Sequence, residues 1–116
     1  MSDTLVVDGK YYLMSNDILI ASKTEAETTA PFAIRANTSY TLICSELASD
    51  EEIPIEVYDP SIEDFTQLYD GGDAVKFALN YQKITFANES MFIRIVKPIT
   101  DGEVGVSVFY AWGASC

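Results

Sequence analysis

Hydrophobic and polar residues alternate with a period of two along almost every apolar segment of this chain, and turn-forming residues separate the segments. This pattern is typical of antiparallel strands with one buried face, because neighbouring side chains of a strand point to opposite faces of its sheet. No segment of ten or more residues keeps a helical period with caps at both ends. The pattern therefore predicts an all-β protein.

The clearest local signal is at the N-terminus. Residues 4–7 and 10–14 flank the dipeptide Asp8-Gly9, which suits a two-residue type I′ turn because both central residues take a positive φ. A hairpin is predicted there, followed by a short separate strand at 18–21. The polar stretch 22–31 has little to bury and is predicted to be a loop or an arm between subunits.

In the middle of the chain, the alternation predicts strands at 39–47 and 53–57. The first would bury Tyr40, Leu42 and Cys44, with Cys44 as a small free thiol in the core. The second contains Pro54, which cannot donate a hydrogen bond to a neighbouring strand, so an edge strand or a bulge is expected.

Further along, Gly71 and Gly72 can supply positive φ in a hairpin between strands 65–69 and 74–79. Val75, Phe77 and Leu79 are predicted to form one apolar face. A helix over 61–69 is a weaker alternative to a turn followed by a strand.

Two more strands are predicted at 90–97 and 103–111, the first ended by Pro98. Turns recur every eight to twelve residues, which favours a single antiparallel β-sandwich or jelly-roll-like domain of about eight strands over residues 1–116, with a small barrel as the alternative. The last residues, 112–116, are expected to form a C-terminal tail.

Charge is distributed unevenly along the chain. The net charge is −11; residues 36–75 carry ten Asp and Glu and no Lys or Arg, whereas the other 76 residues carry eight acids and seven bases. Binding to nucleic acid or to an anionic membrane is driven by Lys and Arg, so neither is an expected partner. No secretory signal or membrane-spanning stretch is recognisable, and synthesis in a cytoplasm is expected.

The chain has no histidine, which argues against histidine-dependent nucleophiles, acid-base catalysis by imidazole and ordinary zinc sites. We expect no enzymatic activity and no cofactor. Carboxylates around Asp59, Glu63 and Asp64, or Asp70 and Asp73, could ligate calcium, but they lack the spacing of a known calcium loop, and a solvated acidic rim is favoured. Exposed Tyr and Trp side chains could stack on sugars, although such residues more often fill a core or an interface.

The segments IPIEVYD, FTQLYDGGDAVKFALN, ITFANESMFIRIVKP and DGEVGVSVFYA together resemble the small β-sandwich accessory proteins of tailed-bacteriophage virions. The shared features are a glycine-containing turn, an N-x-x-I step, the strand FIRIVK and a final G-x-V-x-V strand. The resemblance covers roughly two-thirds of the chain and brings no catalytic or binding motif with it. It implies a virion location and a head decoration or cement protein bound to the major capsid protein, or else a tail, neck or fibre component.

The last two predicted strands are apolar or aromatic on both sides, so one face of each is available to a partner. We expect a homodimer or homotrimer that docks on a larger protein lattice. The expected interface residues are Phe92, Arg94, Phe109 and Trp112. A carbohydrate-binding or receptor-binding β-module is the alternative from another functional class.

Overall fold

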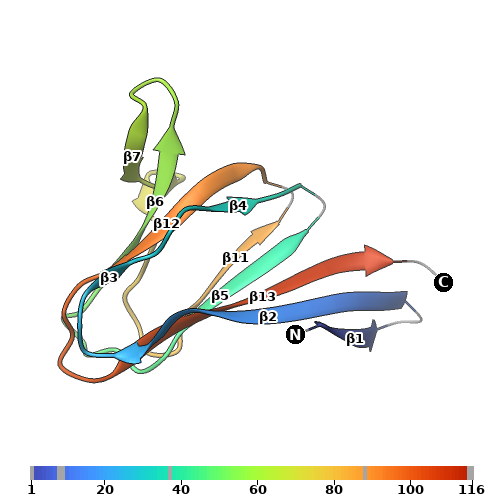
Figure 1. Ribbon diagram of the computed structural model, residues 1–116, viewed down its shortest axis with the longest axis horizontal. Coiled ribbons are helices and arrows are strands. Elements are labelled where there is room, and N and C mark those ends of the chain that lie inside the picture. Colours follow the sequence, from blue (N-terminus) through green and yellow to red (C-terminus); the bar gives the residue numbers. More distant parts are fainter. Residues whose placement is uncertain (1, 8–9, 37, 88, 115–116) are drawn as a thin grey trace.

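A computed structural model describes the backbone of residues 2–7, 10–36, 38–87 and 89–114, and the side chains of residues 17–36, 38–87 and 89–109. These residues form strands and turns with no helix, which confirms the predicted all-β class (Figure 1). The strands are β1 (Ser2–Val7), β2 (Lys10–Lys23), β3 (Glu27–Thr28), β4 (Phe32–Ile34), β5 (Ser39–Cys44), β6 (Ile53–Asp59), β7 (Asp64–Gln67), β8 (Tyr69–Asp70), β9 (Asp73–Ala74), β10 (Lys76–Phe77), β11 (Lys83–Ala87), β12 (Met91–Lys97) and β13 (Val104–Ala114).

Two antiparallel sheets stack to form a β-sandwich (Figure 1). The first sheet has the strand order β1-β2-β13-β5-β11, and the second has the order β10-β6-β12-β3. Strand β4 also pairs with β12, β7 pairs with β6, and β8 and β9 form a small hairpin of their own. The alternation of the sequence thus produces the predicted two-layer architecture.

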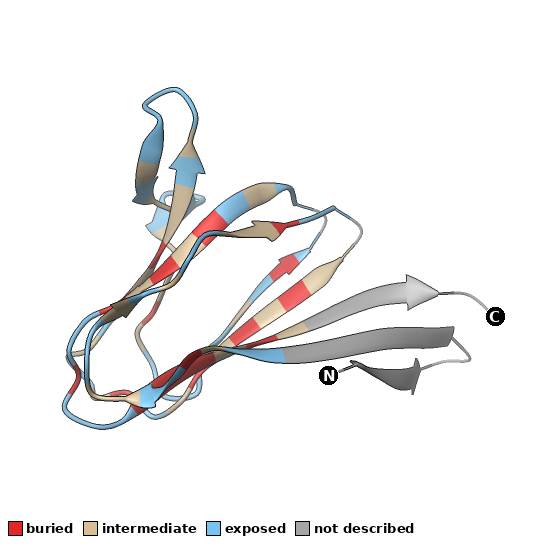
Figure 2. Cartoon of the chain, viewed as in Figure 1, coloured by how far each residue is buried: buried red, intermediate tan, exposed pale blue. Residues whose placement is uncertain are grey.

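The hydrophobic core lies between the two sheets and is built from the inward side of each alternating strand (Figure 2). Tyr40, Leu42 and Cys44 are buried on β5, as predicted, while Thr41 and Ile43 on its other side are half-buried. Each large aliphatic side chain buried in this way stabilises the fold by about 1.5–3 kcal/mol relative to an exposed one. The other buried apolar residues are Ile20, Ile34, Leu47, Ile53, Ile55, Phe77, Phe86, Ile93, Ile95, Val104, Val106 and Val108.

The N-terminal hairpin forms as predicted, with Val7 paired to Lys10; the turn at residues 8–9 lies outside the described residues. The separate strand predicted at 18–21 is wrong, because β2 runs without a break through Asn16 and Asp17, which pair with β13. Strand β13 likewise continues through residues 112–114, which the sequence placed in a tail. Strands β2 and β13 pair with each other along most of their length, and this pairing keeps both of them extended.

The segment 22–31, expected to be a polar loop or arm, begins as the end of β2, and its later part runs along β12. Strand β3 pairs Thr28 with Val96. Beyond β3, the Thr29 amide donates to the Ile95 carbonyl at 3.0 Å, and the Ile95 amide donates to the Thr29 hydroxyl at 3.0 Å. The part of the segment around Thr28 and Thr29 is therefore hydrogen-bonded to the second sheet.

Pro54 led to the expectation of an edge strand or a bulge, and the edge-strand alternative is wrong. Strand β6 has β12 on one side and both β7 and β10 on the other. Its pairing with β12 ends at Ile55, which is opposite Ile95. Pro54 comes immediately beyond that last pair, so the ladder with β12 ends where a proline could not have donated to it.

The turn predicted after β6 forms, but the strand predicted at 65–69 is divided into β7 and β8, and the strand predicted at 74–79 is divided into β9 and β10. Residues 60–63 form a turn and residues 64–67 form β7, so the helical alternative over 61–69 is not adopted. Gly71 and Gly72 join β8 to β9 with φ of +61° and +92°, in the left-handed region that glycine adopts without strain. The two glycines thus form the turn that the sequence predicted.

The apolar face predicted for Val75, Phe77 and Leu79 is only partly right. Phe77 is fully buried, but the side chain of Leu79 is 69% exposed. Strand β10 ends at Phe77, and the side chain of Gln82 then accepts hydrogen bonds from the Ala78 and Leu79 amides at 2.7 and 3.1 Å. This local polar contact replaces the strand and turns Leu79 towards solvent.

Candidate functional site

The four residues predicted to form an interface lie in both sheets. Phe92 and Arg94 are on the outer side of β12, opposite the buried Ile93 and Ile95. Phe109 belongs to β13 in the first sheet, and so cannot join them on one surface. Trp112 pairs with Leu13 in the same sheet, and its side chain lies outside the described part. The structure therefore brings only the first two together.

Arg94 is held in place by two neighbours on the second sheet. Its Nε donates to Glu56 Oε1 of β6 at 2.7 Å, and its guanidinium carbon lies 4.3 Å from the centre of the Phe65 ring of β7. A flat guanidinium can pair with a carboxylate and stack on a ring at the same time, which an ammonium cannot. The side chain is thus fixed and its charge neutralised before any partner binds.

Two further aromatic side chains, Tyr58 and Phe92, lie on the same outer side of the sheet as this arginine. Tyr58 of β6 and Phe65 are register partners, and their rings meet edge to face with centroids 5.5 Å apart. Phe92 is 56% exposed and Tyr58 is 38% exposed. We call Tyr58, Phe65, Phe92 and Arg94 the aromatic surface; aromatic residues and arginine are the residue types enriched in the centres of protein interfaces.

Sequence analysis missed Tyr58 and Phe65 as members of this surface. The signal for Tyr58 was present, since it alternates with the inward-facing Ile55 and Val57. Phe65 carried no comparable signal, because its position depends on the register of the β6–β7 hairpin, which pairs it with Tyr58. Pairing between strands, and not the alternation within one strand, assembles the surface.

Acidic residues lie next to the aromatic surface, where the β6–β7 hairpin turns. Asp59 Oδ1 accepts hydrogen bonds from the Ser61 hydroxyl at 2.6 Å and from the Ser61 amide at 2.9 Å, and these bonds lower the pKa of Asp59. Glu63 and Asp64 on the same turn are exposed. Within the described residues, no three His, Cys, Asp or Glu side chains are placed to hold a metal ion together. We call Asp59, Glu63 and Asp64 the acidic rim.

A buried lysine, unremarkable in the sequence, closes one end of the sandwich. Lys97 is 1% exposed, and its Nζ donates to the Glu25 carbonyl at 2.7 Å, the Pro98 carbonyl at 3.1 Å and the Thr100 hydroxyl at 3.1 Å. Loss of hydration lowers the pKa of Lys97 below its ordinary value of 10.5. These contacts connect the loop before β3 and the loop before β13 to the end of β12, so the role of this side chain is structural.

Cys44 has the core position that the sequence predicted. It is fully buried with a free thiol, and its Sγ lies 3.4 Å from the Leu79 carbonyl oxygen. Burial raises the pKa of this thiol above its ordinary value, because the charged thiolate is poorly solvated there. A thiol in that state is a weak nucleophile at neutral pH.

Comparisons with known proteins add little. No protein-family model matches the sequence, and no curated protein matches it. Among solved structures, the chain is similar to peruvianin-I, a cysteine peptidase from Thevetia peruviana latex, with 12% identity and a TM-score of 0.42. That match covers 90% of this chain and 50% of the other. In the described part, nothing helical has the length and hydrophobicity to cross a membrane.

Proposed function

We propose that this chain is a non-enzymatic protein that binds another protein through the outer side of its second sheet. The observation that carries the proposal is the packing of Arg94 between Glu56 and Phe65, beside the exposed ring of Phe92. An arginine whose position is already fixed loses little conformational freedom on binding, which favours affinity. The absence of histidine from the sequence supports a binding role over a catalytic one.

The acidic rim indicates the chemistry of the partner. Residues 36–75, which include β6 and β7, carry acids and no base, so an apolar surface with Lys or Arg at its edges is complementary to this face. Attraction of this kind speeds the encounter and weakens as salt is added. Binding through the aromatic surface should therefore be weaker at high salt.

The resemblance in sequence gives this partner a more specific form. A head decoration or cement protein binds the outer surface of the major capsid protein lattice and stabilises it, and this is the role we propose, with the virion as the location. A tail, neck or fibre component would use the same surface on a different virion protein. The number of copies in an assembled particle separates these roles, since a shell protein is present in hundreds of copies.

The test mixes the purified chain with undecorated phage shells and measures co-sedimentation. Phe92→Ser and Arg94→Ala should each reduce binding at least tenfold, as expected for residues at the centre of an interface. Ile99→Ser is the matched control, because Ile99 is 77% exposed and belongs to the loop after β12. Failure of the unaltered chain to co-sediment would count against the decoration role.

A carbohydrate-binding module is the second candidate, because the exposed Tyr58 and Phe92 rings offer flat surfaces on which a sugar could stack. A glycan-array screen distinguishes the two candidates. Saturable sugar binding that is lost in Phe92→Ser, without binding to shells, would favour the carbohydrate module.

A further inference from the structure

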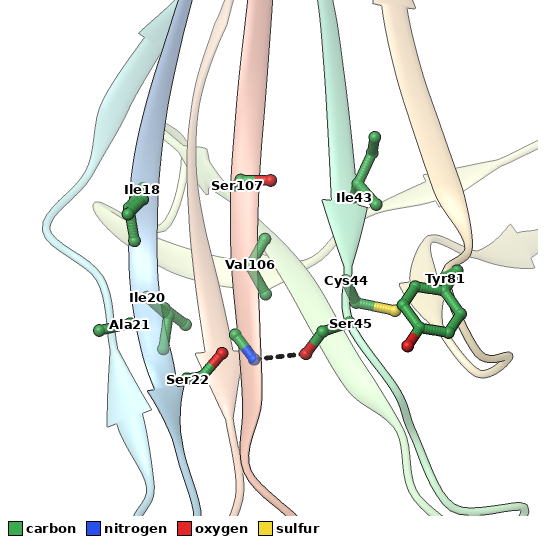
Figure 3. A pocket seen from close by; sticks show the side chains of 11 residues that line it. Ile18, Ile20, Ala21, Ser22, Ile43, Cys44, Ser45, Tyr81, Val106 and Ser107 are labelled. Carbon is green, nitrogen blue, oxygen red and sulfur yellow. Dashed lines mark hydrogen bonds between the residues drawn. The ribbon is translucent and has the colours of Figure 1, made fainter.

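The outer face of the first sheet carries a row of uncovered side chains. Ile18 of β2, Ser107 of β13, Ile43 of β5 and Lys83 of β11 are register partners across four adjacent strands. The neighbouring row on β13 and β5 faces the core, so this row faces outward. Figure 3 shows three of its members, Ile18, Ser107 and Ile43, on their three strands. Ile18 is the most prominent member, with 71% of its side chain exposed.

A hollow of about 370 Å³ opens beside Ile18. Its lining includes buried Gly105, which lies where the pairing of β13 with β2 is irregular. A Cβ at Gly105 would lie 2.8 Å from the Ile20 carbonyl oxygen and 2.9 Å from the Ser22 amide nitrogen. No larger residue fits there without a shift of the backbone, so this part of the lining requires glycine.

The same face lacks the acidic character of the chain as a whole. None of the described residues that line the hollow is charged. Asp17, next to Ile18, borders the face on β2, and Lys83 borders it on β11. Two molecules that each carry a net charge of −11 repel one another wherever acidic surfaces meet, so a close contact between copies requires a face of this kind.

We propose that this face binds a second copy of the chain, with Ile18 of each copy entering the hollow beside Gly105 of the other. A two-fold contact uses the same patch on both copies, so the patch must contain both a projection and a matching recess. Here the projection, Ile18 of β2, and the recess beside Gly105 of β13 lie on adjacent strands. The proposal is independent of the proposed function, which uses the opposite sheet.

Salt distinguishes the two contacts. The contact between copies is apolar and forms against a net repulsion, so screening by added salt strengthens it. The contact with a basic partner is attractive and weakens under the same conditions. The dimer should therefore become tighter over the range of ionic strength in which docking through the aromatic surface becomes weaker.

Sedimentation equilibrium of the full chain tests the proposal. The expected mass rises towards twice the chain's 12.8 kDa as the concentration increases over roughly 1 to 100 µM. Ile18→Lys should raise the dissociation constant of the dimer at least tenfold, because each copy then places a charge in the recess of the other. Ser107→Arg, on the adjacent strand, should have the same effect. It replaces Ile18→Lys in the test if circular dichroism shows that Ile18→Lys is misfolded.

Ile99→Lys and Phe92→Lys are the controls, since both positions are exposed and lie outside this face. Both variants should dimerise like the unaltered chain, and Phe92→Lys should still lose binding to shells. A monomer at every concentration would overturn the proposal. A dimer that survives both Ile18→Lys and Ser107→Arg, that is abolished by Phe92→Lys, or that dissociates as salt is added would overturn it as well.

Discussion

The Nζ of Lys97 lies 3.1 Å from the Oγ1 of Thr100, and both side chains are almost completely withdrawn from solvent. The Thr100 hydroxyl in turn donates to the Gly102 carbonyl at 2.8 Å, and the Thr100 amide donates to the Thr24 carbonyl at 3.0 Å. A buried ammonium group is tolerated only when its hydrogen bonds are satisfied. Lys97 therefore holds together the loop before β3 and the loop before β13.

Replacement of Lys97 by Met should destabilise the protein by about 1–3 kcal/mol at neutral pH, because three acceptors lose their donor. Urea unfolding measures the change. Lys83→Met is the matched control, since Lys83 is exposed on β11, and it should change stability by less than about 0.5 kcal/mol. A Lys97→Met protein as stable as the original would mean that the buried charge costs as much as its hydrogen bonds contribute.

The same pair of proteins gives a pH prediction. The pKa of Lys97 is lower in the folded protein than its ordinary value of 10.5. At a pH between the lowered pKa and 10.5, the unfolded chain therefore binds more protons than the folded protein. Stability from this group therefore rises with pH across that interval and falls as the pH drops. The stability difference between the original protein and Lys97→Met should grow in favour of the original from neutral pH towards 10.5. A difference independent of pH would contradict the lowered pKa.

Gly105→Ala should destabilise the fold by about 1–3 kcal/mol, the usual cost of forcing an extra carbon into a filled space. The two atoms that the new methyl group would meet most closely belong to the backbone of β2 and cannot rotate away. Gly102→Ala is the control, because no atom lies within 4 Å of its added Cβ; stability should be unchanged or slightly increased. Thermal unfolding of both variants checks the contrast, and equal midpoints would contradict it.

The ion pair between Arg94 and Glu56 should matter more for binding than for folding. Both side chains are partly exposed, so a double-mutant cycle with Arg94→Met and Glu56→Gln should give a coupling below about 1 kcal/mol. Arg94→Lys keeps the charge but loses the flat group over Phe65. It should leave the urea midpoint nearly unchanged while weakening co-sedimentation with shells, and full binding by this variant would show that stacking is not needed.

Where alternation alone decides a strand, the sequence predicted the structure well. Strand β12 reads MFIRIVK, and its inward residues Ile93 and Ile95 are fully buried, as the period of two requires. The turn at Gly71 and Gly72 was equally predictable, because few residues other than glycine adopt positive φ without strain. Both signals are local, and neighbouring strands do not change them.

Predictions failed where a distant partner decides the outcome. Asn16 and Asp17 look like a break in the sequence, but hydrogen bonds to β13 keep them in β2. Lys97 looks like an ordinary polar strand end, but loops from before and after β12 supply the acceptors that allow its burial. Neither partner can be identified from the local sequence.

The candidate site was predictable only in part for the same reason. Alternation placed Phe92 and Arg94 on one outer side, and the structure keeps them there. It could not separate them from Phe109, because sheet membership depends on the topology. It could not add Phe65 either, since that residue reaches Arg94 only through the register of β7 on β6.

The path of the chain between its two sheets has a consequence for how the protein folds. The chain changes sheets after β2, β4, β5, β10, β11 and β12, so few of its strand pairs join neighbours in sequence. To form such pairs, segments distant in sequence must meet, and the chain loses conformational entropy before the contacts between them stabilise the structure. Folding should be slow for a domain of this size, on the order of milliseconds to seconds, with neither layer able to form ahead of the other.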